Sequence, residues 1–439
     1  FSFSCCCVHF SPNTNFLTYN KVILKITFYI FEFLKGFVIL TFILFSRYME
    51  RTYMNFNLNE QQQLLQETVR KFAKKELPDI AYEIEKNDNP PERNIIKRFA
   101  ELGFLGVNLP VEYGGAGLSH FDAVLVLEEI AKISIAVAFP IFESSFGPAL
   151  AISSFAPLEL KKNILPKVCS GDMVIAVSMS EPNAGSALTD LTTKAEVKDD
   201  KIILNGQKRW CSGAGHADAY VVYSRMSDEK GAKGIGAVLL EKNAKGFSFG
   251  KPERHMGFRG VPSADMYFDN VEIPLKNIIV PAGGFTKLME AFDLERCGNT
   301  TMSLACAQSS YDYVLNYIQE RKQFGKPIID FQAVQLQLAE IKMKIDASRL
   351  LLYRAVVNAD KDLPSIADSS IAKCFANEIA REVTGKCVQL MGGYGYSKEY
   401  PIEQKMRDAW GWGIAGGSID IQKTNIASAL IGRRFNQRN

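Results

Sequence analysis

The chain has 439 residues, 47% of them hydrophobic, which is enough to bury a large core in two or three domains. Its formal charge is +3, but five basic and two acidic residues lie within the first 53 positions, which leaves 46 of each sign in the rest. A neutral body argues against a nucleic-acid-binding protein, whose affinity comes largely from basic side chains; four His and no Cys-x-x-Cys pair likewise argue against a metal site.

The first 53 residues form an extra hydrophobic segment that is predicted to lie outside the fold. Residues 22–45 are long and apolar enough to cross a bilayer, but Lys25, Glu32 and Lys35 would be costly at its centre. The abundance of Phe and Ile argues against a mitochondrial transit peptide, which would be rich in Arg and Ser. We interpret residues 1–53 as translated sequence upstream of Met54, with a membrane anchor as the alternative.

Periodicity divides the rest of the chain into three predicted domains, at 54–169, 170–285 and 286–439. The first is expected to be helical, because apolar side chains recur at helical spacing between charged ones. The second has the period of two that is typical of β-strands, and 201–204 are expected to be a strand that enters a tight turn at Asn205-Gly206. The third returns to helical patterns and is expected to form a bundle, with helices at 311–321, 332–359 and 366–390.

Five short motifs follow one another along these domains: 112–117 (EYGGAG), 180–186 (SEPNAGS), 210–212 (WCS), 321–325 (RKQFG) and 389–395 (QLMGGYG). In order and spacing they resemble the motifs of the acyl-CoA dehydrogenase family, over nearly the whole chain from Met54. The resemblance implies an α+β multidomain fold, with an N-terminal helical domain, a middle β-barrel and a C-terminal four-helix bundle. It also implies a flavoprotein that binds FAD and acyl-CoA, passes electrons to an electron-transfer flavoprotein, and forms a homotetramer or homodimer.

Oxidation between the alpha and beta carbons of a thioester needs a base, a hydride acceptor and donors for the enolate-like oxygen. No side chain accepts hydride, so a flavin must do so. Most family members carry the basic Glu in the loop that corresponds to 406–418, but Gly416 stands at that position here. The isovaleryl-CoA and long-chain enzymes instead place it on a helix, directly before an Arg, as Glu295 stands before Arg296. We therefore predict Glu295 as the base, with Asp420 as the alternative.

The resemblance also implies which residues bind the ligands. The Gly416 N–H is expected to bind the thioester carbonyl, and the flavin ring is expected to contact Met179, Ser180, Gly185, Ser186, Trp210 and Ser212. The pyrophosphate and adenosine of a neighbouring subunit's FAD are expected at Arg321, whose guanidinium makes paired bonds to phosphate, and at Gln332, Gln389, Gly392 and Gly393. Further cofactor contacts are expected at Gly417, Ser418 and Asp420. Substrate contacts are expected at Ser186, Phe292, Asp293 and Arg296.

Two other classes of function remain as alternatives to a dehydrogenase. The first is a non-standard CoA-ester enzyme on the same scaffold, such as a reductase, an oxidase or a carbon–sulfur lyase. The second is a non-catalytic or DNA-binding homologue, which would not need Glu295 and would show a basic face that the neutral body lacks. The family resemblance further implies a role in β-oxidation and a cytoplasmic location, with the mitochondrial matrix as the alternative.

Overall fold

The computed structural model describes residues 57–359 and 363–435. The chain divides into two units, Phe1–Asn59 and Glu60–Asn439, and all the helices and strands below belong to the second unit. The hydrophobic segment predicted at 1–53 lies outside the described residues.

Seven helices form the N-terminal part of this unit: α2 (Glu60–Glu76), α3 (Pro78–Asn87), α4 (Arg93–Glu101), α5 (His120–Ala131), α6 (Ile135–Ser145), α7 (Pro148–Phe155) and α8 (Leu158–Cys169). A capping box starts α5, because Ser119 and Asp122 each accept a hydrogen bond from the other's backbone N–H. Helices α6 and α7 are apolar on all sides. The stretch from Ile135 to Phe155 could cross a membrane by length and composition, but 94% of it is buried inside the protein, so these are core helices.

The middle of the unit is one eight-stranded sheet, in the order β6-β7-β3-β2-β4-β5-β8 with β1 parallel to β4. The end strands β6 and β8 are not paired with each other in the described part of the chain. The strands are β1 (Ile175–Ser178), β2 (Lys194–Lys198), β3 (Lys201–Ser212), β4 (Ala219–Arg225), β5 (Ile235–Glu241), β6 (Phe247–Phe249), β7 (Ser263–Pro274) and β8 (Ile278–Val280).

The structure corrects the turn predicted at Asn205-Gly206. Strand β3 continues through both residues, and the turn that precedes it includes Asp199, whose φ is +53°. The pairing of β3 with β7 shifts register between Leu204 and Gly206. A Cβ on Gly206 would lie 2.8 Å from the Cα of Thr193, and its φ is +137°. The Asn-Gly pair therefore marks a bulge inside a continuous strand.

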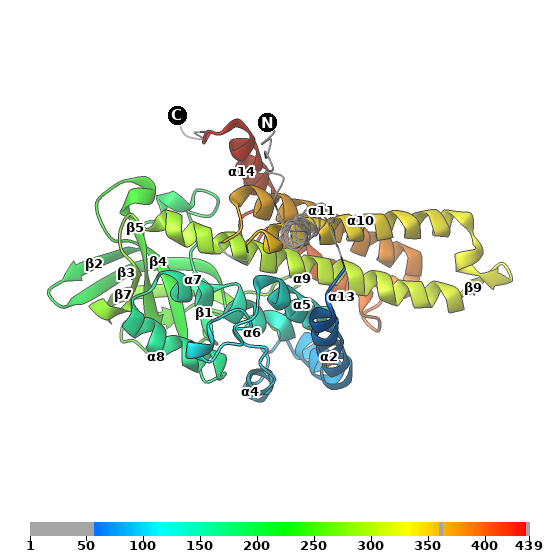
Figure 1. Cartoon of the computed structure of the whole chain (residues 1–439), viewed down its shortest axis with the longest axis horizontal. Helices are drawn as coiled ribbons and strands as arrows, with labels where there is room; N and C mark the ends of the chain where they lie inside the picture. The colour runs from blue at the N-terminus through cyan, green and yellow to red at the C-terminus, as the bar shows by residue number, and fades with distance from the viewer. Residues whose placement is uncertain (1–56, 360–362, 436–439) are drawn as a thin grey trace, which may run out of the picture. The chain divides into compact units, whose positions relative to one another are not determined.

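Helices return after the sheet: α9 (Phe285–Glu320), α10 (Gln332–Val357), α11 (Ile366–Met391), α12 (Gly393–Tyr396), α13 (Ile402–Trp412) and α14 (Ile419–Ile431). Helix α9 has 36 residues, so it is about 54 Å long. It runs from the sheet to a small hairpin, β9 (Lys322–Gln323) with β10 (Lys326–Pro327) (Figure 1). Short 3₁₀ turns complete the fold, at Val111–Tyr113, Leu188–Asp190, Gly231–Gly234, Leu275–Asn277 and Ile328–Asp330.

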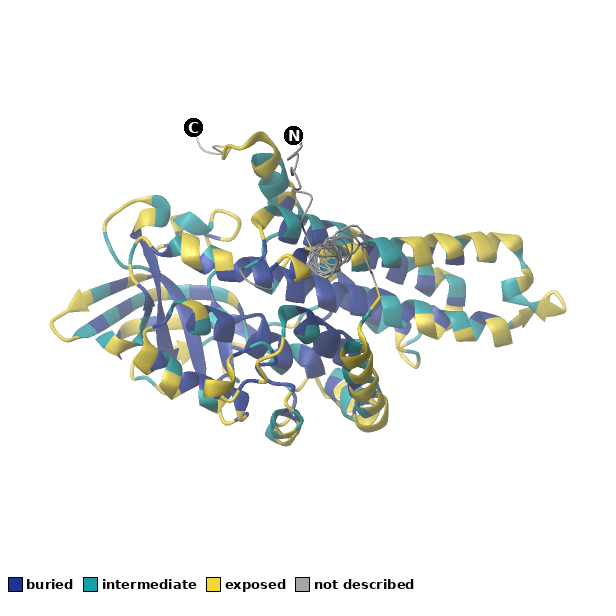
Figure 2. Cartoon of the chain, viewed as in Figure 1, coloured by how far each residue is buried: buried dark blue, intermediate teal, exposed yellow. Residues whose placement is uncertain are grey.

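Burial is greatest where α9 passes between the sheet and the other helices. Figure 2 shows the sheet interior and the middle of α9 as largely buried, and the ends of α9 and α10 near the hairpin as more exposed. Residues 291–307 of α9 are buried with one partial exception, Glu295. A long helix that is buried on all sides in this way can hold a polar group out of water only if its neighbours satisfy that group.

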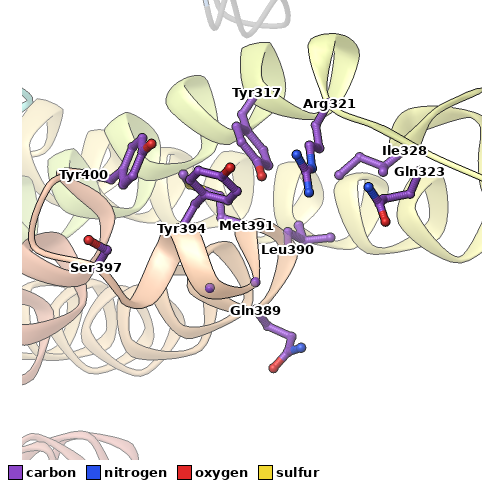
Figure 3. A pocket seen from close by; sticks show the side chains of 12 residues that line it. Tyr317, Arg321, Gln323, Ile328, Gln389, Leu390, Met391, Tyr394, Ser397 and Tyr400 are labelled. Carbon is purple, nitrogen blue, oxygen red and sulfur yellow. The ribbon is translucent and has the colours of Figure 1, made fainter.

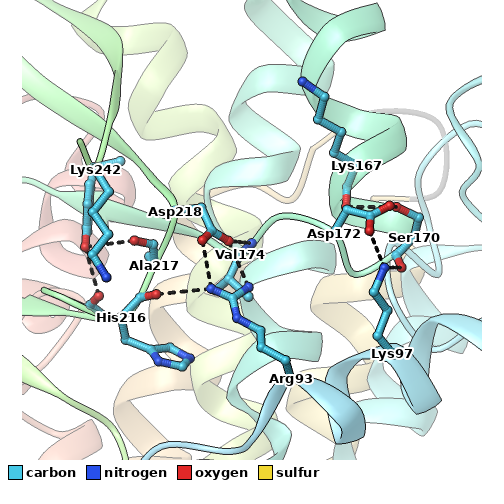
Figure 4. Close-up of polar contacts among 12 residues, drawn as sticks. Arg93, Lys97, Lys167, Ser170, Asp172, Val174, His216, Ala217, Asp218 and Lys242 are labelled. Carbon is cyan, nitrogen blue, oxygen red and sulfur yellow. Dashed lines mark hydrogen bonds and ion pairs between the residues drawn. The ribbon is translucent and has the colours of Figure 1, made fainter. Parts of the chain in front are cut away.

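Helix α4 is tied to the sheet by charged side chains (Figure 4). The Arg93 guanidinium donates to both carboxylate oxygens of Asp218, each over 2.8 Å, and Asp218 also accepts from the Val174 N–H over 2.7 Å. Lys97 pairs with Asp172 in the same region. These bonds hold the entry to β1, and therefore the segment that follows this strand.

Candidate active site

Glu295 lies on the face of α9 that meets the loop between α13 and α14. Phe292, Glu295 and Asn299 are spaced by three and four residues, so their side chains lie along one face of the helix. A Cβ on Gly416 would lie 3.3 Å from the Asn299 Nδ2 and 3.8 Å from the Phe292 Cζ. The two neighbours that flank Glu295 on this face are thus the ones that approach Gly416. The structure thus brings the face of α9 that carries Glu295 against Gly416.

The surroundings of Glu295 favour its protonated form. Burial raises the pKa of Glu295 to about 8, although the charges of Arg296 and Lys373 act in the opposite direction. Burial raises the pKa of Glu143 on α6 and of Tyr223 on β4, and electrostatic repulsion from Glu295 raises both pKa values further. A carboxyl group with a strongly raised pKa, next to a loop, is a candidate for acid–base chemistry.

Glu143 is a second carboxyl group at this site, and sequence reasoning gave it no role. It is 4% exposed. Within the described residues, its Oε2 has no hydrogen-bond partner. Burial and the nearby Glu295 charge both raise its pKa well above the ordinary value, so the pair favours at most one ionised member.

The loop at 413–418 offers a free backbone donor. Gly416 and Gly417 both have positive φ values, +66° and +82°, a conformation that suits glycine. The N–H groups of Ile414 and Ala415 both donate to the Gly411 carbonyl. For the Gly416 N–H, by contrast, the structure of residues 57–359 and 363–435 provides no acceptor. This N–H can therefore bind a ligand oxygen.

Two of the residues predicted to bind substrate interact with each other instead. Asp293 and Arg296 are each 6% exposed and form an ion pair within α9, and Asp293 also accepts from the Ser369 hydroxyl of α11 over 2.9 Å. The Arg296 guanidinium lies 5.2 Å from the centre of the Phe292 ring, which is also buried. In this arrangement they join α9 to α11, and their contact with substrate stays a prediction.

The residues predicted to contact the flavin ring lie side by side at the ends of β1 and β3. The Ser180 carbonyl accepts from the Arg209 N–H over 2.9 Å, which places Ser180 next to Trp210. Trp210 is 52% exposed, with a φ of +61°, and its ring is covered on one side by the Arg209 guanidinium at 4.1 Å. Ser212 ends β3 and is half-buried, whereas Gly185 and Ser186 lie in the exposed loop after β1.

A buried ion pair fixes this segment, and the sequence analysis did not identify it. The Lys208 ammonium donates to the Met179 carbonyl over 2.8 Å and to Glu181 over 2.9 Å. Glu181 also accepts from the N–H groups of Thr192 and Thr193. These partners hold the pKa of Glu181 down at about 2, despite its burial. The backbone at Met179 and Ser180 is thereby locked onto β3.

An open pocket lies at the other end of α9 (Figure 3). Its volume is about 580 Å³, and its lining includes four predicted cofactor residues: Arg321, Gln389, Gly392 and Gly393. A Cβ on either glycine would meet no atom within 4 Å, so the backbone there borders open space. A guanidinium beside an exposed glycine backbone suits the phosphates of a dinucleotide such as FAD. Gln332 begins α10 and is not among the lining residues.

The remaining predicted cofactor residues start α14, directly after Gly416. The Ser418 hydroxyl caps this helix by accepting from the Ile421 N–H over 3.4 Å, and Asp420 is exposed in the first turn. The Gly417 carbonyl points inward, where it accepts from Lys373 over 2.8 Å and from Gln422 over 3.0 Å. Three predicted positions are therefore adjacent in space, and one of them is held by a lysine that sequence reasoning missed.

Comparison with known proteins identifies three family models along the chain. The N-terminal domain of acyl-CoA dehydrogenases matches residues 59–172, the middle domain matches 176–271, and the C-terminal domain matches 282–431.

Similar curated proteins have several activities. The short-chain-specific acyl-CoA dehydrogenase of Clostridium acetobutylicum is 34% identical, over 86% of this chain and 100% of that protein. The acryloyl-CoA reductase (NADH) of Anaerotignum propionicum is 35% identical, over 87% and 97%. The 3-sulfinopropanoyl-CoA desulfinase of Cupriavidus necator is 34% identical, over 87% and 98%.

Solved structures of similar proteins have the same fold. Butyryl-CoA dehydrogenase from Megasphaera elsdenii superposes with a TM-score of 0.83 at 32% identity, over 86% of this chain and 100% of that chain. The FAD complex of PigA superposes with a TM-score of 0.82 at 26% identity, over 86% and 99%.

Proposed function

The chain belongs to the acyl-CoA dehydrogenase family and uses FAD, and we propose that it oxidises an acyl-CoA thioester to the 2-enoyl-CoA, with Glu295 as the base. The observation that supports this most is the position of Glu295 on the face of α9 that approaches Gly416. Gly416 stands where most of the family has its basic Glu. A carboxylate on the helix replaces the one that the loop lacks.

The proton transfer needs an ionised Glu295. Because burial raises its pKa to about 8, this carboxylate is a stronger base than an exposed Glu. As the alpha proton leaves, negative charge develops on the thioester oxygen. The free Gly416 N–H donates a hydrogen bond to that oxygen and stabilises the charge. When bound, FAD supplies the acceptor for the beta hydride.

FAD is proposed to contact two regions of this fold. Met179, Ser180 and Trp210 would hold its ring, and Arg321 with the glycines of the open pocket would hold its phosphates. Arg321 is 26 residues beyond Glu295 on one helix, or about 39 Å along its axis. A single dinucleotide does not span both the base and this pocket. We therefore propose that each pocket serves the FAD of a second copy of the chain, in a homodimer or homotetramer.

Two further assignments are proposed on the family alone. The electrons are expected to pass to an electron-transfer flavoprotein, as the resemblance implies. A cytoplasmic location is supported by the bacterial origin of the similar proteins.

A different reaction on the same scaffold is the second candidate, because the similar proteins include a reductase and a desulfinase. A reductase would use the same carboxyl group in the opposite direction, to protonate the alpha carbon. A lyase that eliminates a sulfur group from the beta carbon would also need a base for the alpha proton, so Glu295 does not distinguish it from a dehydrogenase. Net reduction of the flavin distinguishes them, because the elimination leaves the flavin oxidised.

Anaerobic titration of the purified protein with acyl-CoAs of graded length and branching tests the proposal. We expect the oxidised flavin to bleach with at least one of them, and with none of the corresponding enoyl-CoAs. Bleaching that is restored by oxygen at catalytic rates would indicate an oxidase. If no acyl-CoA bleaches the flavin, but an enoyl-CoA rapidly oxidises the chemically reduced protein, the protein is a reductase and not a dehydrogenase. If neither happens, the dehydrogenase proposal is wrong.

A further inference from the structure

Lys373 on α11 is fully buried and has an unusual set of partners. Its ammonium donates to three backbone carbonyls of the Gly416 loop: Trp412 over 3.1 Å, Ala415 over 2.9 Å and Gly417 over 2.8 Å. A protonated lysine has three N–H groups and a neutral one has two, so this geometry requires the ammonium form. Burial, and after it the nearby Arg296 charge, lower the pKa of Lys373 to about 7. The three carbonyls that accept hydrogen bonds from this side chain favour its charged form.

The bond to Ala415 sets the direction of the Gly416 N–H. In a trans peptide the C=O of one residue and the N–H of the next point in opposite directions. The Ala415 carbonyl points inward to Lys373, so the N–H of Gly416 must point away from it. Asn299 donates to the same carbonyl over 3.4 Å. The Gly416 N–H is the loop amide that the proposed chemistry uses, and Lys373 on α11 therefore fixes its orientation.

Lys373 is also a charge beside the proposed base. The charged and titratable groups that face Glu295 are Arg296 on its own helix, Lys373 on α11, Glu143 on α6 and Tyr223 on β4. Arg296 is paired with Asp293, which offsets its charge. In the described part of the chain Lys373 bonds only to neutral carbonyls. Its charge is thus the least compensated positive charge near Glu295.

We propose that Lys373 is a positioning residue for the reaction: it aims the Gly416 N–H at the substrate and its charge favours the ionised form of Glu295. This inference rests on the function proposed above. It assigns two effects to one side chain, and they can be separated because a neutral hydrogen-bond donor preserves only the first.

The test is the pH dependence of anaerobic flavin reduction by the best acyl-CoA, measured on FAD-loaded protein. Lys373→Met removes both the donors and the charge, whereas Lys373→Gln keeps two donors without the charge. The matched control is Lys405→Met. Lys405 is also a buried lysine that donates to backbone carbonyls, those of Lys132 and Ile133, but its charged neighbours are Asp408 and Glu85.

We expect both Lys373 variants to move the midpoint of the pH profile upward by about one pH unit or more, since an opposite charge close to a carboxyl group lowers its pKa by that much. Lys373→Met should also weaken acyl-CoA binding and slow reduction more than Lys373→Gln, because it loses the bonds that hold the loop. Lys405→Met should lower thermal stability and leave the midpoint in place. An unchanged midpoint in Lys373→Met, or an equal shift in Lys405→Met, overturns the proposal.

A measurement on the unmodified protein covers the case in which neither Lys373 variant folds. Hydrogen exchange of the Ile414 and Ala415 amides, which donate to the Gly411 carbonyl, should be slower than in an unstructured peptide of the same sequence, because the loop is held. Exchange at the unstructured rate would contradict the inference. The same measurement distinguishes its failure from that of the proposed function: a held loop in a protein whose flavin no acyl-CoA reduces would overturn the function and leave the loop anchor standing.

Discussion

Two arginines, one in the buried part of α9 and one directly after its end, have different surroundings. Arg296, near the middle of the protein, is buried and paired with Asp293 on the same helix. Arg321, just after the helix ends, lines an open pocket. Its guanidinium lies 5.3 Å from the centre of the Tyr394 ring and, in the described part of the chain, forms no ion pair. The first arginine is satisfied by the fold, whereas the second still has donors to offer. If the proposed roles are right, folding of one chain completes the proton-transfer region but leaves the phosphate-binding region to be completed by a ligand.

This contrast predicts that the rate of flavin reduction and the retention of FAD depend on different residues. Changes near Glu295 should slow flavin reduction while the protein keeps its FAD. Changes near Arg321 should release FAD while the remaining loaded protein reacts normally. Each prediction below tests whether the two regions are independent in this way, in order of decreasing effect.

Replacing the base should have the largest effect. Glu295→Gln keeps the shape of the side chain but removes its ability to take a proton, so flavin reduction by acyl-CoA should fall by about 10²–10⁴-fold. Anaerobic stopped-flow absorbance measures this rate. FAD content should be unchanged, because Glu295 is remote from the open pocket. Glu290→Gln is the matched control, since Glu290 is exposed on the same helix. Reduction of the Glu295→Gln flavin at the unmodified rate would refute the assignment.

Removing the Arg321 guanidinium, the proposed hydrogen-bond donor to the FAD phosphates, should have the next largest effect. This change should weaken FAD binding and not slow flavin reduction. Arg321→Ala loses charge-assisted bonds worth about 1.5–3 kcal/mol, which weakens FAD binding by roughly 10- to 150-fold. The retained flavin after gel filtration and the dissociation constant for added FAD report this loss. Lys322→Ala controls for charge, because Lys322 is exposed next to Arg321 and does not line the pocket. Equal FAD affinity in Arg321→Ala and the unmodified protein would show that the pocket is not a cofactor site.

Between the two properties, only the rate of flavin reduction should depend on pH, whereas FAD retention should not. Glu295 acts as its carboxylate, and its pKa is raised to about 8, so the second-order rate of flavin reduction should increase as the pH rises through 8. From pH 7 to pH 9 the gain should be about tenfold, from the change in the ionised fraction. FAD retention should stay constant over the same range, because arginine guanidinium groups do not lose their proton at these pH values. A rate that is flat from pH 6 to pH 9 would contradict a buried Glu as the base.

Restoring a loop carboxylate should have the smallest effect. Gly416→Glu in the Glu295→Gln background should recover a few-fold of the lost rate if both positions face the same alpha carbon. The recovery is limited, because a side chain at φ +66° is strained and its Cβ would press on Asn299 at 3.3 Å. Single-turnover flavin reduction measures the gain over Glu295→Gln alone. No recovery, with FAD and acyl-CoA still bound, would place the two carboxylates at different atoms of the substrate.

The comparison of sequence and structure is most instructive on α9. Periodicity predicted a helix at 311–321, but the helix begins at Phe285. Residues 291–307 are buried on nearly all sides, so this stretch has no polar stripe to produce a helical period. Polar side chains there are satisfied within the helix: the Thr300 and Thr301 hydroxyls donate to the carbonyls one turn earlier. The sequence signal for Lys373 is that it is the only charged residue in the apolar stretch 371–376, which indicates a buried lysine with specific partners.

The sequence by itself determined the family, the order of helical and β regions, and the residue types of the candidate site, because these depend on local motifs and on side-chain chemistry. Through the family resemblance, it also predicted that the loop lacks the usual carboxylate, at Gly416, and that Glu295 replaces it. Only the tertiary structure decided that Gly416 and the face of α9 that carries Glu295 meet, and that Lys373 holds the loop between them. Contacts between segments about 120 residues apart, and the burial that raises the pKa of Glu295, arise when the helices pack, so no local pattern encodes them.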